Sequence, residues 1–320
     1  MEYKDNNSNY SPDLPCTFCK CIKGIFSLIF LPSRKYRLAN GFFIVGEAYY
    51  DKGNFDQAYD FYKIAVKLMP NSGIFLNRLG LLTHEIGNID EAIKLLDKTL
   101  KIDLEANEPE YIARDENNLG RALLEKGEYS KAMILFENSL KRFKALDGEY
   151  NTDIAMVQNS LGNALSEIDE YDKAITYYKS ALEINIKAYN FDDPIIAINR
   201  NDLGKAWLDK GEYGKAIICF EQALKSLPKD DKLTVILKGN LGDALFEIGK
   251  YEEAESYYKE ALQVAKKYNT EEKDNNDIII LQERLDEVLQ AKNEKGDLFI
   301  VPSKLDSYSQ GYSEINLLKQ

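Results

Sequence analysis

The chain has 320 residues, of which 44% are hydrophobic and 29% charged, a balance that excludes wholesale disorder and allows a large buried core. Its net charge of −12 disfavours binding to nucleic-acid phosphates and favours protein partners with basic surfaces. The single histidine, His84, argues against zinc sites and histidine-dependent catalysis. We therefore expect no cofactor, no metal and no enzymatic activity.

Residues 1–38 form an N-terminal segment that differs from the rest of the chain in charge. They carry six Lys and Arg against three Asp and Glu, whereas the remainder has a net charge of −15. No run of about 18 apolar residues occurs, so no membrane-spanning helix is expected. The four cysteines are not spaced as a disulfide framework, which favours a reducing compartment and a cytoplasmic location.

Within that segment, residues 16–37 allow three interpretations. The first is a helix that caps the repeats described below through Ile25, Phe26, Leu28, Ile29 and Phe30. The second is a membrane foothold, in which lipidated cysteines and nearby basic residues hold a structural scaffold against anionic lipids. The third is a metal site that would need Cys219 or a second chain as its fourth ligand. The lipidation candidates are Cys16, Cys19 and Cys21.

Residues 39–268 repeat themselves six times around a glycine, which we call the key glycine. The six key glycines are Gly46, Gly80, Gly120, Gly162, Gly204 and Gly242. Twelve residues later (+12) each repeat has alanine, at +16 a large apolar or aromatic residue, and at +19 a small residue. Glycine inside a helix costs about 0.5–1 kcal/mol relative to alanine, so its recurrence needs a reason. We predict that it lets a first helix, helix A, approach the +12 alanine of a second helix, helix B, closely. The side chain at +16 is expected to fill the space one turn further along.

The ends of the two helices are also marked in the sequence. At +7 from the key glycine stands a second glycine in five repeats, typical of a left-handed residue that ends a helix. The fourth repeat has Asp169 at this position. At +9 an aromatic or aliphatic residue follows, which is expected to begin helix B. Each repeat therefore predicts helix A, a short turn and helix B.

These positions closely resemble the tetratricopeptide repeat family. The fifth repeat carries the family pattern as Leu203, Gly204, Trp207, Gly211, Tyr213, Ala216, Phe220, Ala223 and Pro228. The key glycines are 34, 40, 42, 42 and 38 residues apart, and the longer spacings resemble repeats of kinesin light chain and of polarity adaptors that bind G-protein regulatory motifs. The resemblance implies an all-α, right-handed α-solenoid. The six expected repeats are residues 39–72, 73–106, 113–146, 155–188, 197–230 and 235–268.

Two further segments follow the last repeat. Residues 278–290 have apolar residues at helical spacing, which predicts a helix that caps the open end of the array through Ile278, Leu281, Leu285, Val288 and Leu289. Residues 293–320 are polar and are predicted to be a mostly disordered tail. The connections between the later repeats, at residues 144–152, 190–194 and 229–232, are polar and are expected to form loops.

The resemblance to tetratricopeptide repeats implies that the A helices line a concave groove. Asparagine recurs on this face, and its amide can pair with the backbone of an extended peptide. The candidate groove residues are Asn77, Arg78, Asn117, Asn118, Arg121, Asn159, Asn163, Asn201, Lys205 and Asn240. We expect Arg121 and Lys205 to hold acidic side chains of that peptide. His84 is interpreted as a surface or packing residue, and Trp207 and Cys219 as buried packing residues. The sequence thus predicts a protein-binding scaffold, with surface asparagines that bind nothing as the alternative.

Overall fold

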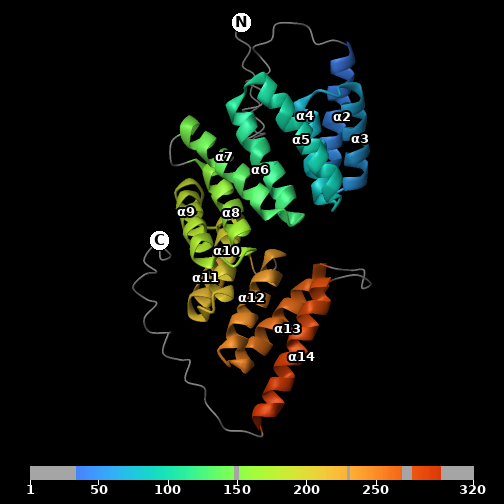
Figure 1. Cartoon of the computed structure of the whole chain (residues 1–320). Helices are drawn as coiled ribbons and strands as arrows, with labels where there is room; N and C mark the ends of the chain where they lie inside the picture. The colour runs from blue at the N-terminus through green and yellow to red at the C-terminus, as the bar shows by residue number, and fades with distance from the viewer. Residues whose placement is uncertain (1–33, 148–150, 229–230, 269–275, 297–320) are drawn as a thin grey trace, which may run out of the picture. The chain divides into compact units, whose positions relative to one another are not determined.

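The computed structural model of the chain describes residues 34–147, 151–228, 231–268 and 276–296. Every regular element in these ranges is a helix, so the predicted all-α fold is confirmed (Figure 1). No helix within the same ranges combines the length and the apolar character that crossing a membrane requires.

The chain divides into two compact units, which we describe separately. The first unit, Met1–Asn71, contains α2 (Arg34–Tyr50) packed against α3 (Phe55–Leu68). The second unit, Ser72–Gln320, contains five further helix pairs and a last helix. Its helices are α4 (Gly73–Glu85), α5 (Ile89–Ala106), α6 (Pro109–Glu125), α7 (Tyr129–Asp147), α8 (Thr152–Ser166), α9 (Tyr171–Ala188), α10 (Pro194–Asp209), α11 (Tyr213–Lys225), α12 (Leu233–Glu247), α13 (Tyr251–Tyr268) and α14 (Asn276–Gly296).

In the second unit each helix packs against the next one along the chain (Figure 1). Helix A of one repeat also contacts helix A of the following repeat, from α4 through α6, α8, α10 and α12 to α14. The A helices therefore lie next to one another and form one continuous wall, as expected of a helical repeat solenoid.

The key glycines are explained by the residue at +16, whose side chain lies directly on them. A Cβ atom placed on Gly120, Gly162 or Gly204 would come within 2.5 Å of the ring at +16, and one on Gly80 within 3.0 Å of Leu96. The alanine at +12 is fully buried in every repeat. The predicted close approach is confirmed, but its nearest partner is the +16 side chain itself, which was expected to lie one turn further along.

The turn between helix A and helix B also follows the prediction. The glycine at +7 has a positive φ in all five repeats that contain it, between 73° and 84°. Asp169, which replaces it in the fourth repeat, adopts the same left-handed conformation with a φ of 60°. Short polar side chains tolerate this region better than other non-glycine residues, which explains why aspartate is accepted here.

The longer repeat spacing comes largely from longer helices. Between Gly80 and Gly120, α5 has 18 residues where α3 has 14, and α6 begins eleven residues before its key glycine where α4 begins seven before. The loops predicted between later repeats lie elsewhere: residues 144–147 of the first belong to α7, whereas residues 190–193 of the second do lie in the connection between α9 and α10. Helix A also begins earlier than predicted in repeat one, since α2 takes in residues 34–38 of the predicted N-terminal segment.

The helix α14 extends from Asn276 to Gly296 and is longer than the predicted 278–290. It packs on α13 and α12 through Leu281, Leu285 and Val288, which are buried as expected for a capping helix. Leu289, which was expected to pack, is 38% exposed. Residues 293–296 of the predicted tail belong to this helix, and the remainder of the tail lies outside the described residues.

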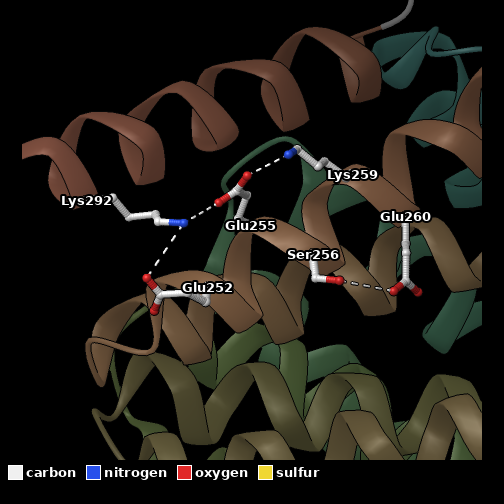
Figure 2. Close-up of polar contacts among 6 residues, drawn as sticks. All are labelled: Glu252, Glu255, Ser256, Lys259, Glu260 and Lys292. Atoms are coloured by element: carbon white, nitrogen blue, oxygen red, sulfur yellow. Dashed lines mark hydrogen bonds and ion pairs between the residues drawn. The ribbon is translucent and has the colours of Figure 1, made fainter.

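Ion pairs fix α14 against the repeat it covers. Figure 2 shows the Lys292 ammonium between two carboxylates of α13, with its Nζ 2.6 Å from Glu255 Oε2 and 3.6 Å from Glu252 Oε1. Glu255 also accepts from Lys259, one turn further along α13. Arg284 pairs in the same way with Asp243 of α12. The cap therefore has a defined register on both helices of repeat six.

Replacing Gly204 by Leu should destabilise the protein, because the new side chain would occupy the space of the Phe220 ring. Overpacking of this kind costs about 1–3 kcal/mol or more, measurable as a lower urea midpoint. The control is Lys225→Leu, an exposed position on α11, which should change stability by no more than about 0.5 kcal/mol. Equal stability of the two variants would contradict the close contact between ring and glycine.

Candidate protein-binding groove

A cleft of about 730 Å³ opens on the wall of A helices in the second unit. Three of its lining residues directly follow a key glycine, at position +1: Arg121 on α6, Asn163 on α8 and Lys205 on α10. All three side chains are exposed. Of the ten residues that the sequence suggested for a groove, the structure brings these three together in one concavity.

The residue at +1 is paired with the residue at +16. Where +16 is tyrosine, its hydroxyl donates a hydrogen bond to an acceptor at +1. Tyr178 donates to Asn163 Oδ1 at 2.7 Å, and Tyr258 donates to Asp243 Oδ1 at the same distance. In the first unit, Tyr62 donates to Glu47 in the same register. The acceptor at +1 thus serves the core of its own repeat.

Where +16 is phenylalanine, this hydrogen bond is absent and +1 is a cation. The residue at +16 is Phe136 in the repeat with Arg121 at +1, and Phe220 in the repeat with Lys205 at +1. Within the described ranges, neither cation forms a hydrogen bond or ion pair with another residue. These two side chains are therefore charged groups at the cleft whose hydrogen-bonding capacity is left to solvent or a ligand.

The same cleft carries more negative than positive charge, which the sequence analysis missed. Its carboxylates are Glu125, Glu167, Asp169, Asp202 and Asp209. Burial raises the pKa of Asp209, and the charges of Asp169 and Glu167 raise it further while Lys205 partly offsets the rise. Because the negative charges of these carboxylates repel one another, the cleft should attract a cationic group of a ligand.

A sequence signal for three of these carboxylates exists. An acidic residue stands at +5 in all six repeats, one helical turn beyond +1: Asp51, Glu85, Glu125, Glu167, Asp209 and Glu247. Residues four apart on a helix share a face, so +1 and +5 line the same wall. His84, interpreted as a surface or packing residue, also borders the cleft, with its Nε2 2.7 Å from Glu125 Oε2.

Most of the other candidate asparagines connect neighbouring A helices. Asn77 donates to Asp115 Oδ1 at 2.7 Å, Asn159 to Asp202 Oδ2 at 2.8 Å, and Asn240 to Asn201 Oδ1 at 2.8 Å. These contacts use side-chain amides that were predicted to face a peptide. Asn117 is fully buried, while Asn118 and Arg78 are half-buried. That these seven residues also contact a partner stays a prediction.

The remaining sequence candidates are placed as follows. Trp207 and Cys219 are buried, in agreement with their interpretation as packing residues, and burial raises the pKa of the Cys219 thiol to about 12. Lysines at 179, 210 and 215 lie over the Trp207 ring. Cys16, Cys19 and Cys21 lie outside the described residues, so lipidation there stays a prediction.

The contact between α4 and α6 should make stability depend on pH. Burial raises the pKa of Asp115 to about 8, and the carboxyl group of Asp103 adds to the rise. Between pH 3.8 and about 8 the folded chain therefore binds a proton that the unfolded chain has released, so stability falls as pH rises through this window. Urea midpoints measured across the window should fall less steeply in Asp115→Asn. Identical slopes in both proteins would contradict the assignment.

The pairing of +16 with +1 can be measured as a coupling energy. Tyr178→Phe and Asn163→Ala should each lower the free energy of unfolding by about 0.5–1.5 kcal/mol, because each removes the same hydrogen bond. The double variant should lose less than the sum of the two. Lys205→Ala is the matched control, since Phe220 at +16 has no hydroxyl, and its effect should stay within about 0.5 kcal/mol. Strict additivity of the first two changes would exclude the coupling.

Comparison with solved structures identifies similar folds. The APC/C hetero-tetramer Cut9-Hcn1 is 17% identical with a TM-score of 0.60; the match covers 80% of this chain and 46% of that one, so this chain spans less than half its length. The apo form of RapI is 18% identical with a TM-score of 0.55, covering 81% and 99%. Putative kinesin light chain TPR-like repeats from Podosopora anserina are 18% identical with a TM-score of 0.53, covering 61% and 96%.

Sequence comparison gives the family. Comparison with the curated proteins finds no match. Three family models do match, and each is described as a tetratricopeptide repeat. One matches residues 71–145 and 153–229, a second matches residues 201–270, and a third matches residues 45–71. Together with the fold, these matches show that the chain belongs to the tetratricopeptide repeat family, as its key glycines indicated.

Proposed function

We propose that this chain is a non-enzymatic scaffold that binds a peptide or helical segment of a partner protein in the cleft on its A helices. The observation that carries the proposal is the pair of exposed cations, Arg121 and Lys205, which form no ion pair within the described residues and line one cleft. A cation whose hydrogen-bonding groups are unused inside the protein is available to a carboxylate of a ligand.

The charges of the cleft suggest what the bound segment carries. An acidic side chain suits Arg121 and Lys205, whereas the carboxylates at +5 suit a basic one. We therefore propose a segment that contains both kinds of charge, with its basic side chains directed at Glu167 and Asp209. Asn163 occupies the same +1 position in the repeat between those of Arg121 and Lys205. Its exposed side-chain amide can bind the peptide backbone.

Panning a random-peptide display library against the full chain tests this proposal. Enriched peptides should bind the unmodified protein and lose at least about tenfold in affinity to the double variant Arg121→Glu and Lys205→Glu, because attractive charges become repulsive. Titration calorimetry with the synthesised peptides gives the affinities.

The matched control is the double variant Lys141→Glu and Lys225→Glu, which makes the same change in net charge at exposed positions on B helices. It should bind the peptides as the unmodified protein does. If both double variants lose affinity equally, the effect is one of overall charge and the assignment to the cleft is wrong. If no peptide is enriched, the proposed peptide binding is contradicted.

A further inference from the structure

The helix α2 carries apolar side chains on two faces. One face includes Ala39 and Gly46, both buried, and packs on α3. A second face carries Leu38, Ile44 and Val45, which are 53%, 58% and 39% exposed. An exposed cluster of apolar side chains on a helix commonly marks an interaction site, so this second face indicates a neighbour that the described residues do not include.

Comparison with the other A helices shows what kind of neighbour belongs there. The exposed residues Leu38, Val45 and Ala48 stand at −8, −1 and +2 from the key glycine. In α6, α8, α10 and α12, the residues at these positions are at most 5% exposed. Each of those four helices packs against helix B of the preceding repeat. The exposed face of α2 therefore has the register of a surface made for a preceding B helix.

A glycine supports the same conclusion. Gly41 stands at −5, on the exposed face of α2, and a Cβ atom there would meet nothing within 4 Å. In α6, α8, α10 and α12 the −5 residue is at most 3% exposed. Each key glycine is explained by the side chain that lies on it, whereas Gly41 carries the same helix cost of about 0.5–1 kcal/mol with no described contact. Close approach of a further helix would explain it.

We propose that residues 16–31 of the same chain occupy this face as helix B of an incomplete preceding repeat. Ile22, Ile25, Phe26, Ile29 and Phe30 follow the spacing i, i+3, i+4, i+7 and i+8 of an amphipathic helix. The segment ends two residues before α2, and the connection from α5 to α6 also has two residues. The apolar side chains of this segment would then be buried against α2. This corresponds to the first of the three interpretations of residues 16–37, a helix that caps the repeats.

Hydrogen exchange of the full chain, followed by mass spectrometry, tests the proposal. Backbone amides of residues 22–30 should exchange at least about tenfold more slowly than in an unstructured peptide of the same sequence. Val45→Lys and, separately, Leu38→Lys should abolish this protection while amides of α10 keep theirs. Rapid exchange of residues 22–30 in the unmodified protein would overturn the proposal, whatever the variants do.

The matched control is Ile64→Lys on α3. Ile64 is 38% exposed, close to the value for Val45, and it stands at +18, where the other five repeats have polar residues. This variant should leave the protection of residues 22–30 unchanged, and its loss there would count against a specific contact with α2.

Two further measurements separate other occupants of this face. Protection that disappears on dilution, together with a dimer in analytical ultracentrifugation, would assign the face to a second copy of the chain and overturn the proposal. The purified full chain should not sediment with vesicles of phosphatidylcholine and phosphatidylserine. Sedimentation that depends on residues 16–31 would assign the segment to a lipid surface instead.

Discussion

The contact between the key glycine and the side chain at +16 determines the geometry of every repeat. A Cβ atom at that glycine would come within 3.0 Å of the +16 residue in all six repeats. A glycine is therefore retained in the middle of helix A although it costs about 0.5–1 kcal/mol there. The contact also fixes how far helix B is displaced along helix A. That displacement decides which residue of helix A lies beside the outer end of the +16 ring, and this residue is the one at +1.

The same contact connects the core to the groove. A tyrosine at +16 places its hydroxyl beside +1 and needs an acceptor there, as Asn163 and Asp243 provide. A phenylalanine has no hydroxyl group to donate. The repeats with Phe136 and Phe220 have Arg121 and Lys205 at +1, and neither cation forms a hydrogen bond or ion pair within the described residues. The hydroxyl oxygen of the +16 tyrosine thus distinguishes two kinds of repeat. With tyrosine, the +1 residue forms a hydrogen bond inside its own repeat; with phenylalanine, the +1 residue can bind a ligand.

The sequence predicted the helices, the turns and the key glycine contact, because each of these is local and recurs in register. It predicted less of the groove. Asn159 and Asn240 were correctly placed on helix A, but their bonds to Asp202 and Asn201 depend on how one repeat lies on the next, which a repeat pattern does not encode. Glu167 and Asp209 were missed although the acidic residue at +5 recurs six times, because charged residues on helices usually face solvent without a specific role.

A stack of helix pairs also has to cover the faces at which it ends. In this respect α14, in the second unit, differs from α2, in the first unit. On α14, Leu281, Leu285 and Val288 face the repeat it covers, and ion pairs from Arg284 and Lys292 hold its edges. On α2, apolar side chains point both toward α3 and away from it.

Full burial of one such apolar side chain of α2 contributes about 1.5–3 kcal/mol to stability. Burying three partly exposed apolar residues therefore represents a sizeable part of the stability of a folded domain, which is typically about 5–15 kcal/mol. Covering this face thus affects the stability of repeat one more than any single exposed ion pair in the groove does, because such pairs contribute at most about 1 kcal/mol.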